Sequence, residues 1–163
     1  MNFLEQLTSE WYEFRGYFVR RNVLVGRRAA GGYECELDVV GFHPGEKRLV
    51  HIEASMDAHT WARREERFSR KFEAGRRYIP SLFAGLDLPT EIEQIALLGY
   101  GSNANRKMLA GATLMVVGDL IAEIVGEIQS KRVAKAAIPE DKPILRTLQY
   151  VCECRNRVLP LLR

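Results

Sequence analysis

The sequence predicts an α/β domain in which helices flank a central mixed sheet. Two runs, 33–40 and 48–55, alternate with the period of two that is typical of strands. The segment between them is short and rich in turn-forming residues, which favours an antiparallel hairpin. Apolar residues recur at helical spacing on both sides of this hairpin, at 2–15 and 58–79.

Length and composition fit one domain with a substantial core. The chain has 163 residues, of which 47% are hydrophobic and 28% are charged, so disorder is not expected. We expect a single domain over 1–163, with its core at about 2–100 and a C-terminal α/β addition at about 101–163. The formal net charge of +3 is only mildly basic, so the choice of partner must follow from where the charges lie.

The remaining elements follow in order along the chain. In the first helix, Glu10 borders the apolar face, and a strand is expected from Tyr17 to Val25. Beyond residue 79, the expected elements are a strand at 92–98, a short helix at 104–110, a strand at 113–117, a helix from Asp119 to about Lys135 and a closing helix at 144–159.

The sequence favours a reduced, cytoplasmic setting. Its three cysteines are too few and too irregularly spaced for a disulfide framework. No run approaches the ~18 apolar residues of a membrane span, and the first residues lack the basic and apolar regions of a signal peptide. We therefore expect no membrane partner.

Carboxylates gather on one face of the predicted hairpin. Alternation gives Asp38 the same face as two glutamates of the first strand, and it gives Glu53 the face of His51 in the second. Counting back from the turn sets Asp38 opposite Ile52 or Glu53, so the two carboxylates should lie close together. Such carboxylates repel unless a cation lies among them, and oxygen ligands suit a hard ion such as Mg²⁺. The alternative is that this face is the solvated side of an antiparallel sheet.

His51 is interpreted as a hydrogen-bonding neighbour of Glu53 rather than as a metal ligand, because the three histidines lack metal-ligand spacing.

The predicted helix at 58–79 carries an apolar stripe and an opposite basic stripe. From Trp61 to Tyr78, seven basic residues stand against three acidic ones, so the local charge is positive. Such a stripe either contacts the phosphates of a nucleic acid or is an ordinary solvated helix face. Lys71 lies on the flank between the two stripes. The candidates for nucleic-acid contact are Arg63, Arg64, Arg67 and Arg70.

The order helix, strand, hairpin, helix, strand, with acids at Glu10, Asp38 and Glu53, resembles the PD-(D/E)XK nuclease superfamily. That superfamily includes restriction endonucleases and Holliday junction resolvases. The resemblance covers about residues 5–100 and implies a restriction-endonuclease-like αβββαβ core, with C-terminal helices added to it. It also implies that Asp38 and Glu53 bind Mg²⁺, for which Mn²⁺ can substitute, and that Glu10 assists from the first helix.

The sequence departs from the family pattern at two positions. Leu37 stands in place of the namesake proline, and Ser55 stands in place of the lysine that follows the glutamate by two residues. The family lysine puts positive charge against the attacking water and the phosphate, which a serine cannot do. Some members supply this lysine from the following helix, where Lys71 is the best substitute. The resemblance therefore implies the catalytic set Asp38, Glu53, Ser55 and Lys71, with Ser55 orienting water.

These observations lead to two expectations for function. The first is a metal-dependent, nuclease-like protein that acts on phosphodiester bonds of nucleic acid, with DNA favoured, and that has a relocated catalytic lysine. The alternative is a catalytically inactive nuclease-fold module that binds DNA or a protein partner. Cleavage of both strands of a duplex usually calls for two sites, so a homodimer is expected only for an active duplex nuclease.

Overall fold

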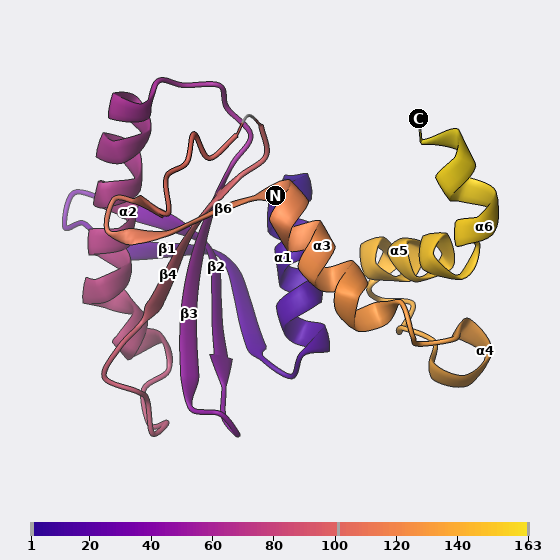
Figure 1. Cartoon of the computed structure of the whole chain (residues 1–163). Coiled ribbons are helices and arrows are strands. Elements are labelled where there is room, and N and C mark those ends of the chain that lie inside the picture. Colours follow the sequence, from indigo (N-terminus) through magenta and orange to yellow (C-terminus); the bar gives the residue numbers. More distant parts are fainter. Residues whose placement is uncertain (1, 101, 163) are drawn as a thin grey trace. The chain divides into compact units, whose positions relative to one another are not determined.

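The computed structural model describes residues 2–100 and 102–162, and the chain divides into two compact units between Val117 and Gly118. The first unit contains α1 (Phe3–Phe14), β1 (Phe18–Arg27), β2 (Tyr33–His43), β3 (Arg48–Ser55), α2 (Trp61–Leu82), β4 (Glu93–Leu98), β5 (Met108–Leu109) and β6 (Ala112–Val116) (Figure 1). The following elements are α3 (Val117–Ile128), α4 (Val133–Ala136), α5 (Pro143–Glu153), α6 (Arg155–Val158) and η1 (Leu159–Leu161).

A mixed sheet forms the centre of the first unit, which confirms the α/β class. Within the described residues the sheet has six strands in the order β1-β2-β3-β4-β6-β5. Strands β1, β2 and β3 are antiparallel neighbours, whereas β3 and β4, and β4 and β6, run parallel. Parallel neighbours require a crossover connection, which α2 provides between β3 and β4. Helices α1 and α2 lie on opposite sides of the sheet (Figure 1).

The hairpin of β2 and β3 has one of the two registers expected from the sequence. Val39 pairs with Ile52 in antiparallel alignment. Asp38 and Glu53 are the next residues along the two strands, so they lie opposite each other. The turn that sets this register includes Lys47, whose φ of 50° falls in the left-handed region.

Both helices of the first unit begin at a side-chain cap and bury one face. Asn2 and Glu5 form a capping box at the start of α1. The Thr60 hydroxyl accepts a hydrogen bond from the Arg63 N–H at 3.4 Å at the start of α2. The largest buried side chains of the two helices are Leu4, Leu7 and Trp11 in α1, and Phe68, Phe72 and Ile79 in α2. This burial fixes which flank of α2 faces β2 and β3.

The expected helix at 104–110 is wrong, because this stretch forms turns and strand β5. Ala104 and Asn105 have φ values of 49° and 60°, which a right-handed helix does not allow. Ala110 and Gly111, with φ values of 54° and 76°, then make the tight turn between β5 and β6. These left-handed residues interrupt a helix that the local composition favours.

The C-terminal region divides at a different point from the expected one. The residues of β5 and β6, expected to lie in an addition that begins at about residue 101, belong to the sheet of the first unit. The helix expected from Asp119 to Lys135 ends as α3 at Ile128 and is followed by the short α4. The closing helix expected at 144–159 consists of α5, α6 and part of η1.

The second unit is held together by a buried amide as well as by apolar packing. Gln149 Oε1 accepts a hydrogen bond from Ile138 N at 2.9 Å, and Gln149 Nε2 donates to the carbonyl oxygens of Lys131 and Ala136. One glutamine thereby satisfies three backbone groups of the connecting segments. None of the helices in the described part of the chain is long and apolar enough to cross a membrane.

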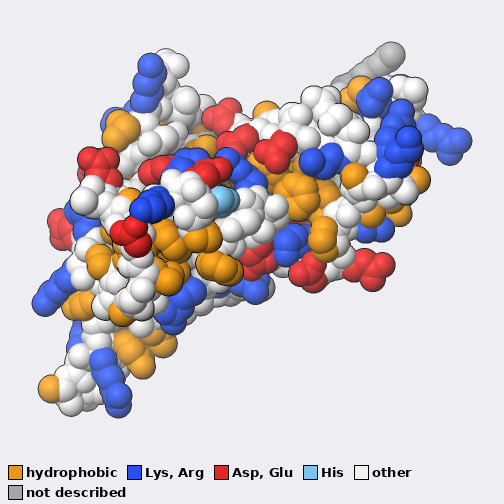
Figure 2. Space-filling model, turned by 90° about the horizontal axis from the view of Figure 1, so that it is seen from below, with side chains coloured by type: hydrophobic (Ala, Val, Ile, Leu, Met, Phe, Trp, Pro, Cys, Tyr) orange, Lys and Arg blue, Asp and Glu red, His pale blue; other side chains and the backbone are white. Residues whose placement is uncertain are grey.

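The surface carries charges of both signs. On the face drawn in Figure 2, Lys and Arg side chains lie among Asp and Glu side chains. Exposed ion pairs include Lys47 with Asp87, and Arg48 with Glu93 at 2.7 Å. With a net charge of only +3, a nucleic-acid contact must be located from individual side chains.

Candidate functional site

The hairpin brings two buried carboxylates together. Asp38 on β2 is 6% exposed and Glu53 on β3 is 1% exposed. The backbone N–H of Asp38 donates to Glu53 Oε1 at 3.3 Å, and Asp38 Oδ2 accepts from the N–H of Ala54 at 2.9 Å. The structure thus brings the two acids together as the sequence predicts, and it buries both of them.

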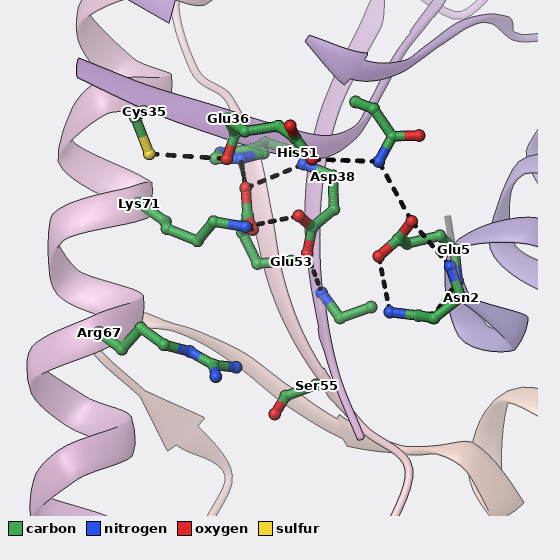
Figure 3. A network of polar contacts seen from close by, with 12 residues as sticks. Asn2, Glu5, Cys35, Glu36, Asp38, His51, Glu53, Ser55, Arg67 and Lys71 are labelled. Carbon is green, nitrogen blue, oxygen red and sulfur yellow. Dashed lines mark hydrogen bonds and ion pairs between the residues drawn. The ribbon is translucent and has the colours of Figure 1, made fainter. Parts of the chain in front are cut away.

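Lys71 reaches this carboxylate pair from α2. Its ammonium donates to Asp38 Oδ1 at 2.5 Å and forms an ion pair with Glu53 Oε2 (Figure 3). Lys71 occupies the flank of α2 that adjoins the buried Phe72, which is why its side chain turns toward the sheet. The lysine considered as a substitute for the missing family lysine therefore lies beside both carboxylates.

Burial and mutual charge interactions shift the pKa values of Asp38, Glu53 and Lys71. Burial, and then the Glu53 carboxylate, raise the pKa of Asp38 to about 6 against the opposing effect of Lys71. Burial likewise raises the pKa of Glu53, although Lys71 opposes this. Burial alone would lower the pKa of Lys71, but the two carboxylates outweigh it and raise that pKa. The ammonium is therefore charged at neutral pH.

His51 lies beside Glu53, as the sequence analysis expects. Its side chain is fully buried, and its Nε2 lies 2.7 Å from Glu53 Oε1. Burial, and then the positive charge of Lys71, lower the pKa of His51 to about 3, so the ring is neutral at physiological pH.

Ser55 has a different partner from the one expected. Ser55 is 2% exposed, and its hydroxyl donates to Asp57 Oδ2 at 2.5 Å. Arg67 Nη1 lies 2.5 Å from the same carboxylate oxygen. Burial raises the pKa of Asp57, but hydrogen bonds from Ser55 and from the N–H of His59 lower it by more, so the pKa lies below its usual value. Sequence reasoning missed Asp57, although an acid just before a basic helix is a signal for this pairing.

The four candidate arginines differ in their accessibility. Arg64 is 7% exposed, its Nη2 donates to the carbonyl oxygen of Asp57 at 2.8 Å, and its guanidinium lies 5.2 Å from the ring centroid of Trp61. Arg64 thus has a structural contact in place of the phosphate contact expected of it. Arg63 and Arg70 are exposed, and together with Arg67 they line a surface pocket on α2.

Two acids of helix α1, Glu5 and Glu10, have side chains with different hydrogen-bond partners. Glu10 is buried and accepts a hydrogen bond from Gln6 Nε2 at 3.0 Å. Glu5, one helical turn earlier, accepts from Asn22 Nδ2 at 3.2 Å, and the same amide donates to Glu36 on β2 (Figure 3). Asn22 therefore links Glu5 of α1 to Glu36 of β2.

Among residues 2–100 and 102–162, no group of three or more His, Cys, Asp or Glu side chains is arranged to hold a metal ion. The expected triad of Glu10, Asp38 and Glu53 is accordingly not assembled. The Lys71 ammonium contacts Asp38 and Glu53. Two carboxylates, Asp38 and Glu53, remain as candidate metal ligands.

Comparisons of the chain with protein-family models, with curated proteins and with solved structures found no significant match.

Proposed function

We propose that the chain is a metal-dependent nuclease-like protein that cleaves phosphodiester bonds of nucleic acid at Asp38, Glu53 and Lys71. One observation carries the proposal: Lys71 extends from α2 to the paired, buried carboxylates of Asp38 and Glu53. Burying carboxylates beside a lysine costs folding free energy, and groups with pKa values shifted in this way cluster at functional sites.

The order of elements supports the same proposal. Within residues 2–98 the chain runs α1, β1, β2, β3, α2, β4, and the two acids lie on the second and third strands. This is the αβββαβ order of the PD-(D/E)XK superfamily, which the sequence resembles. The restriction-endonuclease-like fold is part of the proposal, and it accounts for a lysine supplied by α2 where Ser55 stands in the usual lysine position.

The carboxylate pair has the donor set that Mg²⁺ or Mn²⁺ requires. Asp38 Oδ1 and the buried Glu53 Oε2 both face a single cation, which is now the Lys71 ammonium. Mg²⁺ is usually bound by one or two carboxylates, with waters and substrate phosphates completing its ligands. Asp38 and Glu53 would hold the metal, which supplies Lewis acidity and a water of lowered pKa.

The protein's own residues then have separate tasks. Asp38 and Glu53 supply negative charge that fixes the cation, and the backbone N–H groups of Asp38 and Ala54 orient the two carboxylates. Lys71 provides positive charge next to the phosphate as negative charge develops on its oxygens. Arg63 and Arg70, exposed on the same helix, hold the nucleic-acid backbone by its phosphates.

A catalytically inactive binding module is the second candidate. It is favoured by the ion pairs of Lys71, because this one ammonium already contacts both carboxylates and satisfies part of their charge. Such a protein would keep the fold and bind DNA or a protein partner through its exposed surface.

A cleavage assay separates the two candidates. The full chain is incubated with labelled single-stranded, duplex and branched DNA and with RNA, in Mg²⁺ or Mn²⁺. We expect metal-dependent cleavage that falls ~10²–10³-fold in Asp38→Asn and in Lys71→Met, the range typical of losing one preorganised electrostatic group. Glu36→Gln, which changes an exposed acid on the same strand, is the matched control and should retain activity. If calorimetry shows that the wild type binds Mn²⁺ and the wild type still cleaves none of the substrates, the binding module is favoured.

A further inference from the structure

The His51 ring is enclosed by groups that hold it in one orientation. It is fully buried, its Nε2 faces Glu53 Oε1 at 2.7 Å, and its Nδ1 lies 3.3 Å from Gln94 Nε2. The edge-on ring of Phe72 packs against it, with the ring centroids 5.3 Å apart at 83°. Gln94 pairs with His51 in the parallel register of β3 and β4, so its place beside the ring is set by the sheet.

The hydrogen bonds of Gln94 determine which ring nitrogen of His51 carries the proton. Gln94 Oε1 accepts from Arg76 Nη1 at 2.7 Å, which orients the amide. Its Nε2 then donates to the Phe72 carbonyl oxygen at 2.9 Å and faces His51 Nδ1. A donor opposite Nδ1 makes Nδ1 the acceptor, so a neutral ring carries its proton on Nε2 and donates it to Glu53.

A glycine of α2 provides the space that this ring requires. A Cβ added at Gly75 would lie 2.2 Å from His51 Nδ1 and 2.4 Å from Cε1. No real contact is that short, so any other residue at this position would displace the ring or the helix. Gly75 and His51 are therefore matched in shape.

The two carboxylate oxygens of Glu53 have different partners. Oε1 is the oxygen that meets both His51 Nε2 and the Asp38 N–H. Oε2 is left to face the Lys71 ammonium. A carboxylate without these two donors could rotate and present either oxygen to a cation.

We propose that His51 is a positioning residue for Glu53: its Nε2–H donates to Oε1 and thereby directs Oε2 toward the cation. The inference rests on the proposed function, in which that cation is a divalent metal ion together with Lys71. Residues that orient a metal ligand in this way typically change metal affinity 10–100-fold when they are replaced.

Mn²⁺ binding to the full chain, measured by calorimetry, tests the inference in three variants. His51→Phe keeps a ring but removes the donor, and Gly75→Ala displaces the ring or α2; each should weaken Mn²⁺ binding about 10-fold. His51→Gln retains an N–H₂ donor, so its Mn²⁺ affinity should stay within about 3-fold of the wild type. That change is smaller than the loss of about 10-fold at the low end of the range for residues that orient a metal ligand. His43→Phe, which removes another histidine of the same hairpin, is the control. Wild-type affinity in His51→Phe, or an equal loss in His51→Gln, would overturn the inference.

Nitrogen-15 NMR of the histidine side chains of the metal-free protein gives a readout that needs no activity. His51, assigned by its absence from the His51→Gln spectrum, should carry a proton on Nε2 and none on Nδ1 at pH 7.5. A proton on Nδ1 would overturn the inference. The Nε2–H tautomer in a wild-type protein that cleaves no substrate would instead overturn the proposed function and leave the contact between His51 and Glu53 standing.

Discussion

The ammonium of Lys71 lies 2.5 Å from Oδ1 of Asp38, across the interface between α2 and the sheet. The same ammonium pairs with Glu53, so one cation is shared by two buried carboxylates. A buried ion pair contributes little net stability by itself, but removing one partner leaves uncompensated charge in a low-dielectric site. The relationship therefore makes Lys71 important for folding as well as for the proposed chemistry.

Lys71→Met should destabilise the protein markedly at pH 7.5. Breaking a buried pair typically costs ~3–5 kcal/mol, and we expect about 3 kcal/mol, near the lower end. The reason for the lower value is that 19% of the Lys71 side chain is exposed, so water screens part of the interaction. Urea denaturation followed by circular dichroism measures the change.

Lys47→Met is the matched control for this experiment. Lys47 also pairs with an aspartate, Asp87, but 64% of its side chain and 80% of that of Asp87 are exposed. Little change in stability is expected there. Equal losses in the two variants would contradict the assignment of Lys71 to a buried pair.

The raised pKa of Asp38 predicts a specific dependence of stability on pH. Its pKa is 3.8 in the unfolded reference and about 6 in the folded protein, so the folded state binds the proton more tightly. The stability gained from this proton is fully present below about pH 3.8 and is lost as the pH rises through about 6. Asp38→Asn is neutral throughout and lacks this loss.

The free energy of unfolding of Asp38→Asn, relative to the wild type, should therefore rise between pH 4 and pH 7 by about 2 kcal/mol, given 1.36 kcal/mol per pKa unit and the coupling of Asp38 to Glu53. Urea denaturation of both proteins at several pH values gives this difference. Parallel pH profiles would show that the Asp38 carboxyl has no raised pKa.

The sequence was sufficient to predict the carboxylate pair and the lysine beside it. A strand has a period of two, and the short turn allowed only two registers, so the positions of Asp38 and Glu53 followed from counting. Lys71 was singled out through the resemblance to the PD-(D/E)XK superfamily, because some members of that superfamily supply the lysine from the following helix, and its place beside the buried stripe made it the best substitute there. These patterns are local, and local patterns are visible in one sequence.

The partners of these residues were not predictable in the same way. Gln94 meets His51 because the crossover through α2 sets the register of two parallel strands, and no local pattern encodes that register. Asp57 lies between β3 and α2, where the backbone direction decides which side chains meet. Ala104 and Asn105 adopt left-handed backbone conformations, although the composition of 104–110 favours a right-handed helix.

Arg63→Ala/Arg70→Ala should weaken binding to nucleic acid and reduce its salt dependence. Both side chains are exposed on α2, so each is free to approach a phosphate. Each lost phosphate contact on duplex DNA lowers the slope of log K against log salt by about 0.9, so the double variant should lose up to about 2. Fluorescence anisotropy at several salt concentrations measures the slope.

Arg27→Ala/Arg28→Ala removes the same charge from exposed positions around the end of the edge strand β1 and serves as the control. A similar loss of slope in both double variants would mean that the effect comes from net charge. In that case α2 would have an ordinary solvated face rather than a binding surface.

Asp57→Asn should strengthen binding to nucleic acid, because Asp57 now pairs with the guanidinium that a phosphate would use. Arg67 Nη1 lies 2.5 Å from Asp57 Oδ2, and the side chain of Arg67 is 35% exposed. Asparagine removes the negative charge and keeps one oxygen, which at the Oδ1 position still accepts from the N–H of His59. Its N–H₂ then takes the Oδ2 position, where it donates to the Ser55 hydroxyl, which becomes the acceptor in that contact. The loop should therefore keep its conformation while Arg67 becomes available.

We expect the affinity of Asp57→Asn for duplex DNA to rise several-fold at low salt, and its salt slope to steepen by up to about 0.9, the value for one added phosphate contact. The gain should depend on Arg67, so the double variant Asp57→Asn/Arg67→Gln should bind no better than Arg67→Gln alone. Such dependence is the coupling that a double-mutant cycle measures for residues in contact. An equal gain with and without Arg67 would mean that Asp57 acts only through the net charge, and that its contact with Arg67 does not control access to the basic face of α2.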